Sequence, residues 1–291
     1  MTAPTRPVLR WHGGKWKLAP WILGYFPPHR IYTETFGGAG SMLMRKERCY
    51  AEIYNDLDGE AVNLFRVMQD QDAALRLVEL LRLTPFARTE FALAYEPTAD
   101  AIERARRLVI RSFMGHGSDA ASIDKMGGFR ANSNRSGTTP ARDWVNFPDA
   151  LELAVERLRG VIIENREACK VAGQHDSPST LHYFDPPYMA ETRSWQKTGR
   201  GLGNYRHELD RGGHARLLKF LRGLTGMVVL SGYPSSLYDD ALKDWRRVEC
   251  KALADGARPR IEVLWLNPAC ARALDRQHSG AHTPLFAGVA Q

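Results

Sequence analysis

The sequence predicts an α/β protein whose doubly wound sheet is interrupted by a mostly helical insertion. Strand and helix patterns alternate from residue 30 to residue 70, and they alternate again from residue 161 onward. Between these segments, from about 71 to 160, helical patterns are followed by a long polar stretch without periodicity. A chain of 291 residues can bury a core large enough for this arrangement.

The first alternating segment contains two predicted strands and two predicted helices. The β-rich stretch RIYTETF (30–36) ends in GGAG, and a short helical pattern, SMLMRKE (41–47), follows it. CYAEIYND (49–56) is the second predicted strand, and DGEAVNLFRVMQD (58–70) is a longer helix with Asp58 as its N-cap. The apolar residues of this helix recur at helical spacing: Ala61, Leu64, Phe65 and Met68.

The insertion and the second alternating segment follow. DAALRLVELLRL and AIERARRLVIRSFM have helical periodicity, and the polar stretch runs from 117 to 144. The second segment contains a predicted helix over 214–224 and four predicted strands: VIIEN, LHYF, MVVLSGY and IEVLWLN. We expect residues 276–291 to form a loose tail.

Composition narrows the class of protein. Hydrophobic residues make up 44% of the chain and charged residues 25%, which is typical of a globular protein. No apolar run is long enough to span a bilayer, and the N-terminus lacks the apolar core of a signal peptide, so we expect a cytoplasmic protein. The net charge of +7 permits a polyanionic partner. The four cysteines lie far apart without metal-ligand spacing, which predicts free thiols and no metal site.

A glycine-rich turn, TFGGAGS, joins the first predicted strand to a helix. Such a turn lets a ligand approach the backbone and directs helix N–H groups toward it, although it can also serve packing alone. Asp56 ends the next strand, where an acid can accept hydrogen bonds from both hydroxyls of a ribose. Because the turn lacks GxGxxG, a nucleoside cofactor without a pyrophosphate fits better than NAD. Asp58 is the alternative ribose acid, but it is better placed as a helix cap.

The stretch DPPY (185–188) follows an apolar strand pattern. Its two pyrrolidine rings remove backbone donors and leave carbonyls free to accept hydrogen bonds. Asp185 falls at the carboxyl end of a strand, where open α/β sheets bind ligands. Together, the Asp185 carboxylate, the Pro186 carbonyl and the Tyr188 ring suit the exocyclic amino group of a planar base. A strand-ending turn with a surface carboxylate is the alternative interpretation.

In its motifs and their order, the chain resembles the DNA adenine methyltransferase (Dam) family, particularly small phage and prophage members. RWHGGKWKLAPWI is similar to the family's N-terminal W-x-G-G-K motif, ETFGGAGSM to its S-adenosyl-L-methionine (AdoMet) turn, and DPPY to its catalytic motif. YNDLDGEAVNLFRVMQD resembles the ribose-binding segment, and LSGYPSSLYDDAL and EVLWLN resemble the C-terminal strands. The resemblance covers most of the chain. It departs at His12 and at NDLD, where the family more often has D-I-N.

This resemblance implies a class I AdoMet-dependent methyltransferase fold, a Rossmann-like mixed sheet with helices on both faces. It implies a site-specific enzyme that methylates N6 of a flipped-out adenine in double-stranded DNA. Residues 1–70 and 161–275 would form the AdoMet-binding catalytic domain, and residues 71–160 a target-recognition insertion. The implied cofactor contacts are Trp11, Gly14, Lys15, Phe36, Gly38, Gly40, Asp56 and Asp185. The implied catalytic residues are Asp185, Pro186, Pro187 and Tyr188, and no metal is required.

DNA contacts are expected in the insertion and in the loop that follows DPPY. The stretch 125–142 mixes glycines with donors and acceptors suited to phosphates and base edges. The loop 191–209 is glycine-rich and basic, and it can close over a flipped base. About half of the arginines in RARRLVIR (104–111) are expected to contact phosphate. The predicted contact residues are Lys125, Arg130, Asn132, Asn134, Arg135, Arg142, Arg193 and Tyr205.

Two other functions stay open at the level of the sequence. A methyltransferase acting on cytosine N4, RNA adenine or a protein amide would share the cofactor motifs, although such families more often have Ser or Asn in place of Asp185. A catalytically silent DNA-binding protein would keep the fold, but Lys15, Asp56 and Asp185 are all present. No motif identifies the DNA sequence that is recognised, a restriction partner, or the choice between a monomer and a weak dimer.

Overall fold

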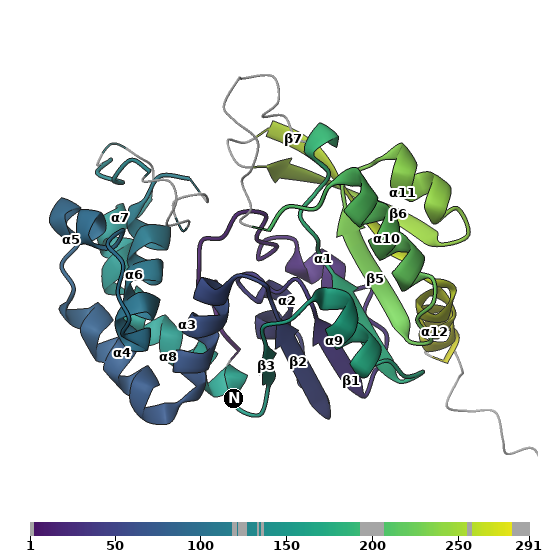
Figure 1. Ribbon diagram of the computed structural model, residues 1–291, viewed down its shortest axis with the longest axis horizontal. Coiled ribbons are helices and arrows are strands. Elements are labelled where there is room, and N and C mark those ends of the chain that lie inside the picture. The colour runs from purple at the N-terminus through teal and green to yellow at the C-terminus, as the bar shows by residue number, and fades with distance from the viewer. Residues whose placement is uncertain are drawn as a thin grey trace, which may run out of the picture.

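The central element of the fold is a mixed sheet (Figure 1). The computed structural model describes residues 3–117, 121, 127–132, 134, 137–192, 207–254 and 258–280. Within these residues the sheet has seven strands in the order β3-β2-β1-β4-β5-β7-β6. The strands β1 to β5 pair in parallel, whereas β7 pairs antiparallel with both β5 and β6. Their bounds are β1 Ile31–Glu34, β2 Ala51–Asn55, β3 Ile162–Glu164, β4 Thr180–Phe184, β5 Met227–Gly232, β6 Arg246–Ala254 and β7 Arg258–Leu266.

Helices cover both faces of this sheet, as the sequence predicts. Phe184 of β4 belongs to a core with the helices α9, α10 and α11, whereas its neighbour Tyr183 belongs to a second core with α1, α2 and α12. Adjacent residues of a strand point to opposite faces, so β4 contributes to both cores. The bounds of these helices are α1 Ala19–Leu23, α2 Ser41–Arg45, α9 Ala168–Gln174, α10 Arg211–Leu221, α11 Ser236–Ala241 and α12 Pro268–Gly280.

The helix α3 (Gly59–Gln69) begins where its N-cap predicts. The Asp58 carboxylate accepts a hydrogen bond from the backbone N–H of Glu60 at 2.8 Å, satisfying one of the donors that the first turn leaves without a partner. Its apolar side, which includes Leu64 and Phe65, is fully buried. The predicted cap and the predicted apolar face of this helix are therefore both confirmed.

Helices of the insertion gather at one side of the sheet, beyond β3 (Figure 1). Two largely buried ion pairs join them to β2 and α3. Arg157 donates to both oxygens of Glu52 in β2, at 2.7 and 2.8 Å, and Arg111 lies 3.0 Å from the Glu60 carboxylate of α3. The bounds are α4 Gln71–Leu83, α5 Arg88–Leu93, α6 Ala101–Met114, α7 Pro140–Val145 and α8 Phe147–Leu158.

The C-terminal part differs from the sequence-based expectation. The strand β6 was not predicted, because its alternating charged and apolar residues lack a continuous apolar run. The helix α12 continues to Gly280, so residues 276–280 do not belong to a loose tail, and residues 281–291 lie outside the described residues. Among the described helices, none has both the length and the apolar character needed to cross a membrane.

Candidate active site

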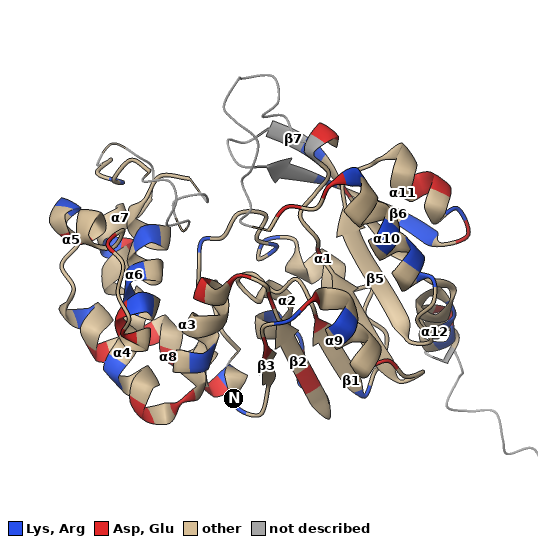
Figure 2. Ribbon diagram, viewed as in Figure 1, with Lys and Arg blue, Asp and Glu red and all other residues tan. Residues whose placement is uncertain are grey.

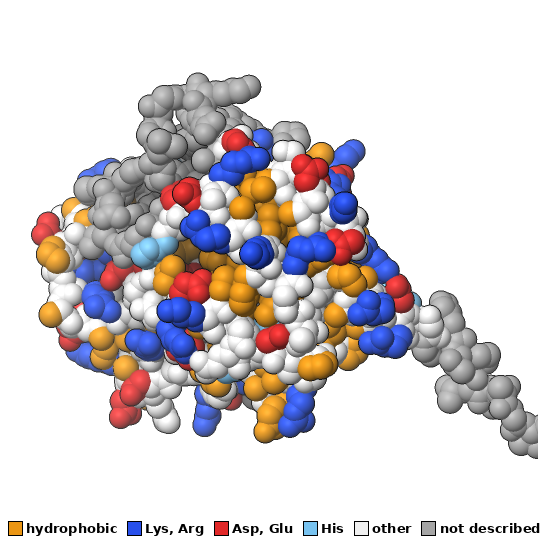
Figure 3. Space-filling view, turned by 45° about the vertical axis from the view of Figure 1, so that its right-hand side comes forward, with side chains coloured by type: hydrophobic (Ala, Val, Ile, Leu, Met, Phe, Trp, Pro, Cys, Tyr) orange, Lys and Arg blue, Asp and Glu red, His pale blue; other side chains and the backbone are white. Residues whose placement is uncertain are grey.

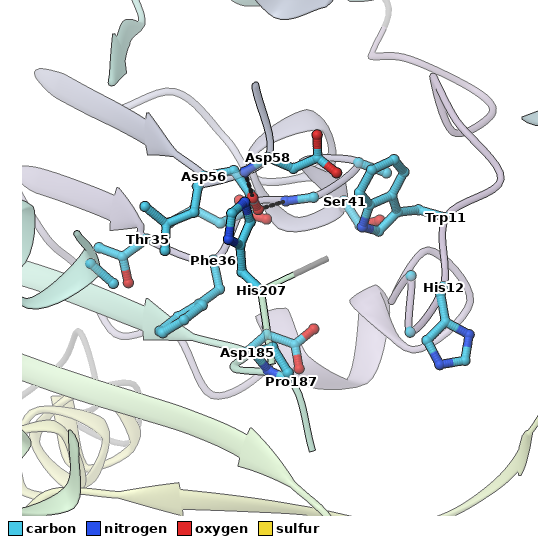
Figure 4. A pocket seen from close by; sticks show the side chains of 18 of the residues that line it. Trp11, His12, Thr35, Phe36, Ser41, Asp56, Asp58, Asp185, Pro187 and His207 are labelled. Carbon is cyan, nitrogen blue, oxygen red and sulfur yellow. Dashed lines mark hydrogen bonds between the residues drawn. The ribbon is translucent and has the colours of Figure 1, made fainter. Parts of the chain in front are cut away.

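A cavity of about 240 Å³ lies at the carboxyl ends of β1, β2 and β4. The chain runs outward in both directions from β1 and β4, so the cavity lies at the point where the strand order reverses, the usual ligand site of such sheets. Figure 4 shows the carboxylates of Asp56 and Asp185 reaching this cavity from different strand ends. Eight of the predicted site residues line it: Trp11, Gly14, Lys15, Phe36, Gly38, Asp56, Asp185 and Pro187.

The glycine-rich turn between β1 and α2 forms one wall of the cavity. Gly38 has a φ of 47°, and a Cβ atom there would lie 2.7 Å from the indole Nε1 of Trp11. Only glycine therefore lets the turn and the tryptophan meet. Gly40, with a φ of 61°, faces the ring of Phe65 and is not among the lining residues. Gly40 is the N-cap of α2, and its predicted contact with the cofactor stays a prediction.

Asp56 fixes this turn through its carboxylate. Its Oδ2 accepts from the backbone N–H of Gly38 at 2.7 Å, and its Oδ1 accepts from the N–H of Asp58 at 2.7 Å. Burial raises the pKa of Asp56 to about 6, although the two N–H donors oppose the shift. Since Asp58 caps α3, the two acids have different structural roles. Asp56, at the end of β2, therefore connects to the glycine-rich turn that follows β1, at the cavity.

Asp185 is held on both oxygens where β4 ends. The ammonium of Lys15 lies 2.9 Å from its Oδ2, and the hydroxyl of Ser231 donates to its Oδ1 at 2.7 Å. Lys15 is only 5% exposed and also donates to the carbonyl of Gly13 at 2.8 Å. A buried ammonium needs a counter-charge, and Asp185 supplies one. The N-terminal motif and DPPY therefore meet directly, although they are far apart in the sequence.

Tyr188 is buried beside this ion pair. Its hydroxyl donates to Oε1 of Glu262, the Lys15 ammonium lies 4.6 Å from its ring centroid, and the Tyr233 ring meets it edge-on at 4.5 Å. Tyr188 and Pro186 do not line the cavity, whereas Pro187 does. The side chain predicted to stack on a base is thus packed between protein groups, and its stacking role stays a prediction.

Sequence reasoning missed four residues of this site. Glu34, at the end of β1, lines the cavity, and burial raises its pKa to about 7. His207 also lines the cavity, next to Asp56 (Figure 4). Ser231 and Glu262 come from neighbouring strands, and burial raises the pKa of Glu262. A charged residue inside the apolar pattern of β7 was the signal that could have identified Glu262.

The predicted DNA contacts are described only in part. Lys125, Arg135, Arg193 and Tyr205 lie outside the described residues. Arg130 donates to the carbonyl of Phe113 at 3.0 Å, and the side chain of Asn132 accepts from the N–H of Asn134. Arg142 is exposed in the first turn of α7.

The arginines of α6 are engaged within the protein. Arg106 and Arg107 each lie 2.7 Å from the Glu103 carboxylate, and Arg111 is 1% exposed. Arg104 lies 3.5 Å from Glu60. Arg111 is too buried to contact phosphate, and Arg104 is the most exposed of the four; how many of them contact phosphate stays a prediction. Figure 2 shows basic and acidic residues interspersed along the insertion helices.

The face visible in Figure 3 has no single patch of positive charge. Lys and Arg side chains are scattered among acidic and hydrophobic ones over the face visible in Figure 3. Among the described residues, no group of three or more His, Cys, Asp or Glu is arranged to hold a metal ion.

The chain was compared with protein families and with curated proteins. The model of one family, described as D12 class N6 adenine-specific DNA methyltransferase, matches residues 11–221. The matched span starts at Trp11 and contains the glycine-rich turn, Asp56 and DPPY. No curated protein matches the chain.

Proposed function

The chain belongs to the D12 class of N6 adenine-specific DNA methyltransferases, and from this premise we propose which of its residues carry out the reaction. Enzymes of this class use AdoMet as the methyl donor and methylate N6 of adenine in DNA. The observation that carries the proposal is that Lys15, Asp56 and Asp185, from three separate segments, line one cavity.

The cofactor half of the cavity fits AdoMet in its chemistry. Asp56 is proposed to accept hydrogen bonds from the ribose hydroxyls, since each of its oxygens has a further lone pair beside the backbone donor it already binds. Trp11 and Phe36 provide aromatic walls, and Gly38 allows close approach to the backbone. Buried carboxylates favour a ligand that carries a cationic sulfonium, and AdoMet supplies its electron-poor methyl carbon.

The adenine half is proposed to lie at DPPY. The lone pair of an adenine amino group is delocalised into the ring, which makes the nitrogen a poor nucleophile. Hydrogen bonds from N6 to the Asp185 carboxylate and the Pro186 carbonyl would favour a more tetrahedral nitrogen whose lone pair is directed at the methyl group. Holding the two reactants in line provides most of the acceleration. The base must first leave the duplex, at a cost of roughly a few kcal/mol, and Tyr188 is proposed to support its ring.

We also propose that two parts of the chain have different roles. Residues 1–70 and 161–275 bind AdoMet and carry the chemistry, and residues 71–160 recognise the DNA. Arg130, Asn132, Asn134 and Arg142 are the proposed contacts among described residues, because they lie in the polar stretch of the insertion. Lys125, Arg135, Arg193 and Tyr205 complete the proposed set. The enzyme is proposed to act on double-stranded DNA in the cytoplasm, as a monomer or weak dimer without an obligatory protein partner.

Expression in bacteria that lack DNA methylation tests this function. Single-molecule sequencing of their DNA should reveal N6-methyladenine at one short recurring sequence, which also identifies the recognition site. The Asp185→Ala variant should leave the DNA unmodified while the purified protein retains much of its DNA affinity. Modified cytosine, or unmodified DNA from cells that contain folded wild-type protein, would contradict the proposal. Equal loss of DNA binding and turnover in the variant would assign Asp185 a structural role.

A further inference from the structure

We propose that Glu262 is a positioning residue that sets Tyr188 and Lys15 around Asp185. The inference rests on the proposed function of this site. Glu262 lies on β7, next to β5 in the sheet, and is 4% exposed. It does not line the cavity, so it acts through the two side chains that it contacts.

Glu262 shares the charge of Lys15 with Asp185. The Lys15 ammonium lies 2.9 Å from Asp185 and 3.7 Å from Glu262. Both carboxylates attract the buried ammonium, so its position is a balance between the two attractions. If Glu262 were neutral, Lys15 would be drawn more strongly to Asp185. The carboxylate that is proposed to accept the adenine amino group would then be occupied more fully by the lysine.

Glu262 also anchors the phenol of Tyr188. The Tyr188 hydroxyl donates to Oε1 of Glu262, and the hydroxyl group is the only polar point by which a protein can fix the direction of a tyrosine ring. The Tyr233 edge and the Lys15 ammonium limit how far the ring can tilt. The same carboxylate therefore fixes both a ring proposed to support the base and a cation that neutralises Asp185.

Single-turnover methylation separates this role from cofactor binding. The Glu262→Ala variant should transfer tritiated methyl groups from AdoMet to unmethylated bacterial DNA about 100-fold more slowly, the loss typical of a displacement of about 1 Å in a reacting group. Its AdoMet dissociation constant, measured by calorimetry, should rise by a much smaller factor than the rate falls. Glu262→Gln should recover part of the lost rate, because its amide oxygen still accepts from Tyr188 although the charge is gone.

Glu52→Gln provides a matched control. Glu52 is a buried carboxylate on β2 that also contacts a lysine, Lys46, but this lysine, unlike Lys15, does not line the cavity. This variant should lose stability in urea and keep its single-turnover rate while folded. A wild-type rate in Glu262→Ala, an equal loss of AdoMet affinity, or an equal rate loss in Glu52→Gln would overturn the inference.

If Glu262→Ala does not fold, two milder variants, Tyr188→Phe and Glu262→Gln, still test the inference. Tyr188→Phe keeps the ring and removes only the hydroxyl that Glu262 binds. The rate losses of Tyr188→Phe and Glu262→Gln should be less than additive in the double variant, because the first removes and the second weakens the same charge-assisted hydrogen bond. Fully additive losses would contradict the inference. Failure of the wild-type enzyme to methylate DNA at all would instead refute the proposed function.

Discussion

The affinity for AdoMet should fall as the pH drops through about 6, because Asp56 must be ionised to accept hydrogen bonds from two ribose hydroxyls. In the free protein, burial raises the pKa of Asp56 to about 6. Two added hydroxyl donors would lower this pKa in the complex, since hydrogen bonds favour the charged form of a carboxylate. Binding therefore requires loss of the Asp56 proton. The contribution of Asp56 is fully present well above pH 6 and is lost below it.

The size of the pH effect on the AdoMet dissociation constant follows from the pKa of Asp56. At about pH 5, one unit below a pKa of about 6, the dissociation constant should be about tenfold higher than at about pH 8. Asp56→Asn should remove two charge-assisted hydrogen bonds. At about 1.5–3 kcal/mol for such a bond, losing even one weakens binding by about 10- to 150-fold. The variant should also bind with little dependence on pH in this range.

Calorimetric titration of AdoMet at several pH values measures this dependence. Repeating it in two buffers of different ionisation enthalpy counts the protons released on binding. Glu34 lines the same cavity and has a pKa raised to about 7, so Glu34→Gln is the necessary control. Its carboxylate already accepts from Tyr32 and from the N–H of Leu43, and the control should keep the loss below pH 6. Equal affinities at about pH 5 and about pH 8, or an unchanged pH dependence in Asp56→Asn, would refute the reasoning.

Three further predictions concern the cavity and the DNA. Lys15→Met removes the ammonium that lies beside the carboxylates of Asp185 and Glu262, so the free energy of unfolding in urea should fall by about 3–5 kcal/mol. An unchanged free energy of unfolding would mean that water replaces the ammonium at both carboxylates. Gly38→Ala places a Cβ 2.7 Å from the Trp11 indole at a φ of 47°, and strain of about 1–3 kcal/mol should lower the melting temperature and weaken AdoMet binding. Arg142→Ala should reduce the salt dependence of DNA binding by about one unit in fluorescence anisotropy, with turnover at saturating DNA unchanged; an unchanged slope would exclude a phosphate contact.

The sequence could identify the groups that end strands. Asp56 and Asp185 each follow an apolar strand pattern, and parallel strands bring such ends to one edge of a sheet. The side chains that hold these groups were not predictable in this way. Ser231 reaches Asp185 because β5 pairs with β4, and Glu262 reaches Lys15 because β7 runs antiparallel beside β5. The pattern of a strand does not reveal its neighbour.

Charge patterns alone do not show which arginines of α6 are already paired within the protein. The run of arginines in α6 is typical of a phosphate-binding helix face, yet Glu103 lies one turn before Arg106 and Arg107, and Glu60 of α3 faces Arg111. The first contact is local and could have been anticipated from i to i+3 and i to i+4 spacing. The second depends on how the insertion docks onto α3, which local spacing does not encode.

The pairing of β1 with β4 has a consequence for how the protein folds and diversifies. These strands lie side by side, although Thr33 and His182 are 149 positions apart. Because the entropy of closing a loop grows only with the logarithm of its length, the insertion raises the closure cost by only about 1 kcal/mol. Such an insertion can thus change in length with little effect on equilibrium stability. Asp185 and the glycine-rich turn meet at the cavity only when this long-range pairing has formed, so cofactor binding reports whether the two distant strands have paired.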